Sequence, residues 1–243
     1  MKTARKVSAA ARTAYDVGTV MQLLERAATK KTRDGMARFG IPSHHAYGVA
    51  MKDIQAIARR VGRDHALALE LWDTEVYEAR MLTAFVDEPE RVTATQMDRW
   101  CRDFDNWAIC DTLCFKLWDQ LPHAWKKVEQ WTKATGEFQK RAGFVLLACL
   151  ASHDKTATDA QFLEGLRLVE REAHDDRNFV KKGINWALRR IGTRNAKLRA
   201  AAIDTGTRLA ESKEPAARWV GRDAVRELTK SSRKAQGRVI KRA

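Results

Sequence analysis

Helix-breaking residues interrupt this chain at nearly regular intervals, and this spacing constrains the fold more than any other feature. Clusters of Gly, Pro, Asp or Ser predict breaks near residues 40–42, 62, 87–89, 121–122, 135–136, 152–154, 175–176, 192–193 and 213–215. No strand-like alternation persists between them. The intervals average about 22 residues, half of the ~40 to 47 residues of a two-helix repeat unit. The sequence therefore predicts an all-α fold of antiparallel helical hairpins that stack on one another.

Composition agrees with a helical protein and indicates the kind of partner. Only four prolines and three tyrosines occur among 243 residues, and Ala, Leu, Arg and Lys are abundant. Lys and Arg together number 45 against 31 Asp and Glu, which gives a formal net charge of +14. A basic excess of this size suits a nucleic acid or another anionic surface.

We expect one repeat-built domain over residues 13–229, because no low-complexity linker divides the chain. Residues 1–12 are basic and free of acidic residues, which is typical of a flexible arm that contacts nucleic acid and weakly resembles a transit peptide. Residues 230–243 form a second basic end. This tail is either a solvated charged end or an arm that follows a nucleic-acid strand and adds non-specific affinity.

The cysteines indicate core packing rather than a metal site. No Cys-x-x-Cys pair and no His at ligand spacing accompanies them; they are Cys101, Cys110, Cys114 and Cys149. We expect no metal and no cofactor. No apolar run approaches the ~18 residues of a membrane span, and no signal-peptide core follows the start. The sequence therefore predicts a cytoplasmic protein without a membrane partner.

Asp111 is the most unusual residue of the chain. Its helical neighbours three and four places away are all apolar; they are Trp107, Ala108, Cys114 and Phe115. Because a buried carboxylate is costly without a cation or several donors, Asp111 requires a partner outside its own helix. It is either a buried residue paired with an Arg of a neighbouring helix or a catalytic carboxylate, with Trp107 one turn away on the same face.

Trp186 lies outside the apolar stripe of its predicted helix. That stripe consists of Val180, Ile184, Ala187, Leu188 and Ile191. The neighbours of Trp186 at i−4, i+3 and i+4 are Lys182, Arg189 and Arg190. Such an indole packs on a neighbouring helix or, together with its cations, contacts a polyanion through its ring while the cations bind phosphates.

Arg141 lies beside the apolar stripe of residues 138, 142, 145 and 149. Three interpretations are open. The side chain extends along the core with its head in water, it clamps a phosphate, or it is the counter-ion of Asp111.

These residues also carry a resemblance. Five stretches resemble the AlkD family of DNA alkylation-repair glycosylases. They are Trp107-x-x-x-Asp111, Lys140-Arg141-Ala142 at the start of an apolar helix, residues 178–189, residues 47–52 and residues 71–80. The resemblance runs from about residue 18 to about residue 230. It implies a superhelix of HEAT-like repeats, an α-solenoid, whose concave basic face holds duplex DNA.

The resemblance also implies an activity in base-excision repair. The protein would hydrolyse the N-glycosidic bond of cationic N3- and N7-alkylated purines in double-stranded DNA without obligatory base flipping. Asp111 would be the catalytic carboxylate, Trp107 and Trp186 would pack against the deoxyribose, and Arg141 would hold the backbone nearby. We expect the DNA to be contacted by four further cations, which are Lys140, Lys182, Arg189 and Arg190.

Two other classes stay open beside the glycosylase. One is a non-catalytic HEAT-like module that binds nucleic acid through the same face, and the other is a protein-interaction scaffold. Asp111 favours the enzyme over the module, because a carboxylate aimed at phosphates weakens binding. The strong excess of positive charge disfavours the scaffold. We expect the protein to act as a monomer in a bacterial-type, nucleoid-associated setting.

Overall fold

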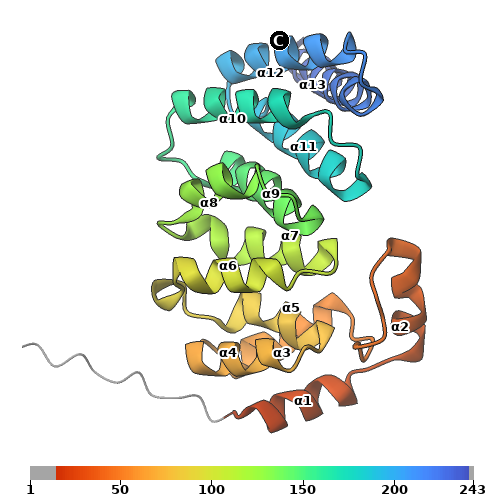
Figure 1. The fold of residues 1–243 in the computed structure, drawn as a ribbon, viewed down its shortest axis with the longest axis vertical. Coiled ribbons are helices and arrows are strands. Elements are labelled where there is room, and N and C mark those ends of the chain that lie inside the picture. The colour runs from red at the N-terminus through yellow and green to blue at the C-terminus, as the bar shows by residue number, and fades with distance from the viewer. Residues whose placement is uncertain (1–14, 241–243) are drawn as a thin grey trace, which may run out of the picture. The chain divides into compact units, whose positions relative to one another are not determined.

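The structure is a computed structural model that describes residues 15–240, with side chains for residues 15–230. Over these residues it consists of helices joined by turns and loops and contains no strand, so the predicted all-α class is confirmed (Figure 1). The helices group into two compact units that divide after Arg91. No linker composition marks this division in the sequence.

The first unit contains five α-helices and two short 3-10 turns over its described residues. They are α1 (Val17–Arg26), α2 (Lys30–Met36), η1 (Ala37–Phe39), α3 (Met51–Val61), α4 (His65–Asp73), α5 (Tyr77–Val86) and η2 (Pro89–Arg91).

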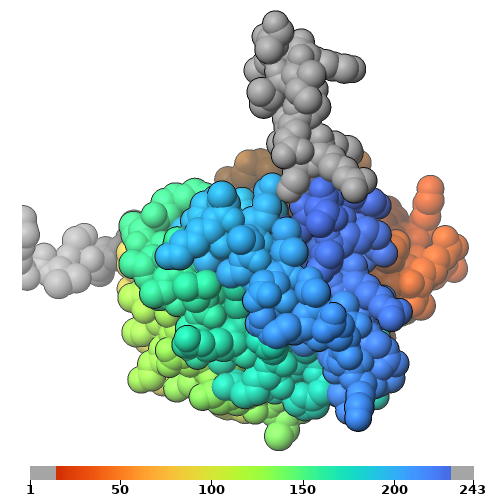
Figure 2. All heavy atoms as spheres, turned by 90° about the horizontal axis from the view of Figure 1, so that it is seen from above, coloured from red at the N-terminus to blue at the C-terminus, as the bar shows by residue number. Residues whose placement is uncertain are grey.

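The second unit contains eight α-helices and one 3-10 turn over its described residues. They are α6 (Ala94–Arg102), α7 (Trp107–Lys116), η3 (Trp118–Gln120), α8 (Ala124–Trp131), α9 (Glu137–His153), α10 (Asp159–Glu172), α11 (Asn178–Ile191), α12 (Ala196–Ala210) and α13 (Pro215–Ile240). In Figure 1, α10/α11 and α12/α13 form successive layers above α9. Helices α7, α9, α11 and α13 pack in succession, and α10 packs on α12. Figure 2 looks onto the α12/α13 end of this unit.

Side-chain caps fix where most helices begin. A side chain before the first turn accepts a hydrogen bond from a backbone N–H two or three residues later, at Asp16, Thr29, Asp64, Thr93, Asn106 and Asn195. Thr158 and Gln161 form a capping box at α10. These caps satisfy N–H groups that have no partner within the helix.

Most predicted breaks coincide with helix ends. Gly62 follows α3, residues 135–136 precede α9, residues 175–176 separate α10 from α11, and Pro215 opens α13. No break is predicted between residues 89 and 121. The structure ends α6 at Arg102 and caps α7 with Asn106.

Two stretches of the first unit that carry the family resemblance lie in contact. The Glu78 carboxylate is fully buried and accepts hydrogen bonds from the backbone N–H groups of Tyr47 (3.0 Å), Gly48 (2.7 Å) and Val49 (3.1 Å). Gly48 has φ +89°, and a Cβ there would lie 2.6 Å from the Thr29 carbonyl oxygen. The loop before α3 is therefore held by one carboxylate and requires glycine at residue 48.

Helix α9 is the central helix of the second unit. Every residue from 140 to 151 is buried, so this helix lacks the polar face of a surface helix. It contacts α7, α8 and α11. Residues on α9 are therefore positioned by neighbours on several sides.

Gly143 allows α9 to approach the end of α8. A Cβ at residue 143 would lie 2.5 Å from the Thr132 backbone nitrogen and 2.8 Å from the Trp131 carbonyl carbon. We expect Gly143→Ala to lower the free energy of unfolding by about 1 to 3 kcal/mol, because backbone must move to admit the methyl group. Gly183→Ala is the matched control, since its new Cβ would meet Arg141 and Phe144 only at 3.5 Å or more. Equal denaturant midpoints for both variants would contradict this interpretation.

The predicted ends of the chain are described only in part. The arm at residues 1–12 lies outside the described residues. In the predicted tail at 230–243, the backbone continues α13 as far as Ile240, and the side chains after Lys230 lie outside the described part. Over the described residues, none of the helices has the length and apolar character that a bilayer crossing requires.

Candidate active site

Helix α7 places Trp107 and Asp111 on one face. The helix begins at Trp107 because the buried Asn106 side chain accepts hydrogen bonds from the N–H groups of Ala108 and Ile109, both at 3.0 Å. Asp111 follows Trp107 by one turn, and both side chains are half-buried.

Two cysteines of α7 anchor this helix on α9. The Cys110 and Cys114 thiols donate to the carbonyl oxygens of Phe138 and Ala142, each at 3.7 Å. All four cysteines of the chain are buried. Burial raises the pKa of the thiols of Cys101, Cys114 and Cys149 well above the ordinary range, so these thiols are unreactive packing groups.

Asp111 and Arg141 form a bidentate ion pair between α7 and α9. Arg141 Nε donates to Asp111 Oδ1 at 2.8 Å, and Nη2 donates to Oδ2 at 2.7 Å. The third guanidinium nitrogen, Nη1, donates to the Phe179 carbonyl oxygen of α11 at 2.7 Å. One guanidinium therefore joins three helices and fixes the plane of the carboxylate.

The two partners differ in exposure. The Arg141 side chain is 7 % exposed and the Asp111 side chain 17 % exposed. A carboxylate has about four acceptor positions, and Arg141 occupies one on each oxygen. Asp111 therefore keeps acceptor capacity at its accessible edge.

Burial and pairing act in opposite directions on the Asp111 carboxyl. Burial raises its pKa above the ordinary aspartate value, and the Arg141 charge counteracts part of that shift. For Arg141, burial acts to lower the guanidinium pKa, but the Asp111 charge outweighs it and the pKa is raised. The bidentate geometry therefore favours an ionised pair.

Two sequence interpretations can now be compared with these contacts. Asp111 was expected to need a partner from another helix, and it has one. Arg141 was considered as a surface cation with its head in water, and this interpretation is wrong, because the residue is 6 % exposed and its guanidinium lies inside the helix packing. It is the counter-ion of Asp111.

Helix α11 brings Trp186 to the side that faces α9. Its predicted core stripe is confirmed, since Val180, Ile184, Ala187, Leu188 and Ile191 are all fully buried. A Cβ at Gly183 would lie 3.5 Å from Arg141 Cγ, so this side of α11 contacts Arg141. Trp186 follows Gly183 by three residues, which places it about one turn further along the same side, where it is half-buried.

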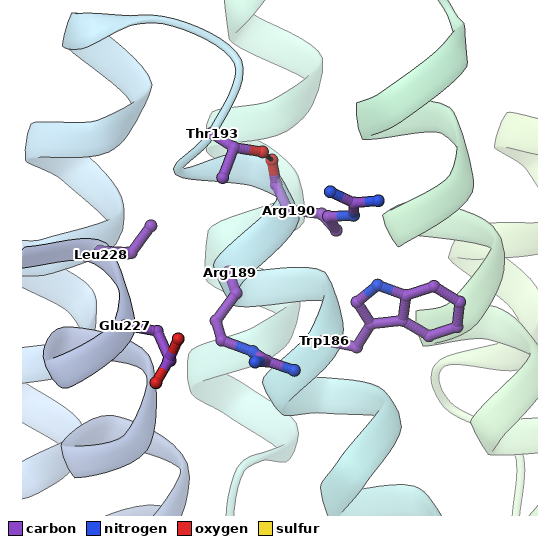
Figure 3. A pocket seen from close by; sticks show the side chains of 6 residues that line it. All are labelled: Trp186, Arg189, Arg190, Thr193, Glu227 and Leu228. Carbon is purple, nitrogen blue, oxygen red and sulfur yellow. Dashed lines mark hydrogen bonds between the residues drawn. The ribbon is translucent and has the colours of Figure 1, made fainter. Parts of the chain in front are cut away.

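Three of the four predicted DNA-contacting cations are accessible. Lys182 is exposed, and Arg189 and Arg190 are half-buried. Both arginines line a pocket of about 220 Å³ together with Trp186, Thr193, Glu227 and Leu228 (Figure 3).

Lys140 has a different environment. It is 7 % exposed, and its ammonium group pairs with Glu172 at 2.7 Å and Asp175 at 3.0 Å. This ion pair attaches α9 to the end of α10 and to the loop that follows it. Its charge is already compensated, so Lys140 is not among the proposed DNA contacts.

Sequence reasoning missed two groups on α13. Trp219 is 41 % exposed, and the Lys181 ammonium of α11 lies 5.3 Å from its ring centroid. Glu227 faces the pocket beside Trp186. The sequence does carry a signal for Trp219, since the Arg218-Trp219 pair repeats the aromatic-beside-cation pattern that singles out Trp186.

Comparison with known proteins identifies the family. A family model described as "DNA alkylation repair enzyme" matches residues 20–228, which is most of the chain. The chain belongs to this family. A search of curated proteins finds no significant match.

A solved structure supports the fold of this DNA alkylation repair family member. It belongs to a protein described as representing a new family related to the HEAT-like repeat DNA glycosylases with affinity for branched DNA structures. The TM-score is 0.72 at 21 % sequence identity, over 79 % of this chain and 83 % of the solved one. At this identity the match establishes a HEAT-like repeat fold, as the resemblance implied.

Proposed function

We propose that this family member is a DNA glycosylase that hydrolyses the N-glycosidic bond of cationic N3- and N7-alkylated purines in duplex DNA, without obligatory base flipping. The observation that carries the proposal is the Asp111 carboxylate. It is held in plane by a buried arginine, keeps an accessible edge, and lies one turn from a half-buried indole. Such a preorganised negative charge suits a positive charge that develops in a transition state.

The proposed chemistry needs no strong general acid. An alkylated purine of this class already carries positive charge, so it departs as a neutral base with the electron pair of the broken C1′–N bond. The sugar is left oxocarbenium-like. Asp111 stabilises this charge and orients a water molecule, whose oxygen bonds to C1′ as its proton passes to the carboxylate or to solvent.

In this proposal, Arg141 is a positioning residue rather than one that contacts the lesion. Two of its hydrogen bonds hold the carboxylate and favour its ionised form, and the third joins the guanidinium to α11. Lys182 and Arg190 are proposed to bind phosphates, and Arg189 is proposed to contact the DNA from the pocket beside Trp186.

The test is release of 7-methylguanine from alkylated duplex DNA by the full chain, followed by chromatography of the freed base. We expect release at a rate that scales with enzyme concentration under single-turnover conditions. Absence of release under conditions in which the protein binds the same DNA would overturn the proposal.

Trp107 and Trp186 are proposed to flank the deoxyribose. We expect Ala at either position to lower the single-turnover rate by about tenfold, because an aromatic face attracts charge that develops at the sugar. Trp125→Ala is the control, since this half-buried indole of α8 packs on Phe162 and bonds Asp154 outside the candidate site. It should lower the melting temperature and keep the rate. A lower melting temperature with an unchanged rate for Trp107 and Trp186 would make them core residues.

A second candidate is a non-catalytic module that binds nucleic acid. The solved relative is described as having affinity for branched DNA structures, and this property is a proposal for the present chain. Asp111 distinguishes the two candidates, because a pure binding surface is weakened by a carboxylate that faces phosphates. We further propose that the chain acts as a monomer on double-stranded DNA in the cytoplasm.

A further inference from the structure

The pocket beside Trp186 is formed by two helices and combines unlike groups. Trp186, Arg189, Arg190 and Thr193 come from α11 and the turn after it, and Glu227 and Leu228 come from α13. Figure 3 shows the Arg189 guanidinium between the Glu227 carboxylate and the Trp186 indole. At about 220 Å³ the pocket is smaller than the ~300 Å³ at which drug-sized sites begin, so a single ring system suits it.

Within the described part of the chain, Arg189 has an unpaired polar group in this pocket. Its Nε is buried and has no hydrogen-bond partner among the described residues. A buried N–H without an acceptor is unfavourable, and native structures rarely retain one. A ligand atom that accepts a hydrogen bond in this pocket would satisfy it.

The charges around Arg189 restrict what that ligand is. A phosphate would meet the Glu227 carboxylate, whose side chain is 45 % exposed, and a cation would meet two guanidinium groups. A neutral ring that carries a hydrogen-bond acceptor beside donors suits both the guanidinium groups and the Glu227 carboxylate. Guanine has this pattern, because its O6 accepts while N1–H and the 2-amino group donate.

We infer that the α11/α13 pocket binds a guanine base that is not paired in a duplex, an inference that rests on the DNA binding of the proposed function. Arg189 donates to O6, and Glu227 accepts from the base N–H groups. The base lies against Trp186 and Leu228. A duplex hides the Watson–Crick edge of guanine, so the ligand is either a DNA nucleotide displaced from its pair or a free guanine nucleotide.

The test uses fluorescence anisotropy of the full chain with undamaged hairpin DNA that contains one bulged nucleotide. We expect a bulged guanine to bind about tenfold more tightly than a bulged adenine, cytosine or thymine, which corresponds to one good bidentate recognition of a base. Fully paired hairpins serve as the reference. Guanosine 5′-monophosphate is then added at the concentration of the hairpin. If it displaces the hairpin, the pocket binds a free nucleotide. If it does not, the pocket binds a base of DNA.

Glu227→Gln tests the pocket directly, because it keeps the size of the side chain and removes the double acceptor. The preference for bulged guanine should fall to about twofold or less. Glu214→Gln removes the same charge from an exposed position and should keep the preference. Equal affinities for all four bulges, or an unchanged preference in Glu227→Gln, would overturn the inference. Because the DNA is undamaged, these outcomes are independent of whether the protein excises alkylated bases.

Discussion

Replacing Asp111 by Asn is expected to lower excision of 7-methylguanine by at least about a hundredfold and to leave DNA binding unchanged or slightly tighter. The amide retains the size of the carboxylate and removes the charge that the oxocarbenium-like sugar requires. Tighter binding would follow from the loss of a negative charge close to phosphates. Single-turnover rates at saturating enzyme separate the chemical step from binding.

Asp119→Asn is the matched control for this variant. The Asp119 side chain is 6 % exposed and pairs with His153, so it too is a buried, paired carboxylate of the second unit. Its loss should reduce stability and leave the excision rate within about twofold, because it lies outside the proposed machinery. If Asp111→Asn retains more than a tenth of the parent rate, Asp111 is a structural partner of Arg141 and the catalytic assignment fails.

The second large effect is expected from Arg141→Met. This change leaves the Asp111 carboxylate buried without a counter-ion, which should cost about 3 to 5 kcal/mol of the free energy of unfolding. The double variant Asp111→Asn, Arg141→Met removes both charges and should recover much of that loss. Denaturant unfolding of the four proteins in a double-mutant cycle measures the coupling.

The Arg141→Met variant should also shift the pH dependence of excision. Burial already raises the pKa of Asp111, and removing the Arg141 charge raises it further. The ionised form required for excision is lost as pH falls through that pKa, so the variant should lose activity at a higher pH than the parent. A folded-state pKa above the unfolded value also means that the destabilisation grows as pH rises through this window. Identical pH profiles would contradict the role of Arg141 in keeping Asp111 ionised.

The requirement for a partner to Asp111 was predictable from the sequence, but the geometry of the pair was not. Helical spacing alone shows that its own helix offers only apolar neighbours. Whether Arg141 contacts water, phosphate or Asp111 depends on how deeply α9 is buried. This helix is buried on all sides because α7, α8 and α11 pack on it. The environment of Lys140 was not predictable for the same reason. This residue looks like a surface cation at a helix start, and Glu172 and Asp175 become its neighbours only in the fold.

Helix boundaries were predictable where glycine or proline marks them, and less so where a cap does. Gly62 and Pro215 lie at helix ends as the sequence indicates. The cap at Asn106 was not predicted, although an Asn before an apolar run is a cap signal. The α11/α13 pocket was not predictable, since Arg189 and Glu227 lie 38 positions apart and no periodicity links them.

The three-helix junction at Arg141 has a consequence for how the protein is made. Its guanidinium binds groups only 30 and 38 residues away along the chain, all of them in helices that are complete at Ile191. Contacts of short sequence separation form early, and synthesis proceeds from the N-terminus. The carboxylate centre is therefore expected to assemble on the nascent chain while α12 and α13 are still inside the ribosome. The α13 side of the pocket, which Glu227 and Leu228 form, is added last.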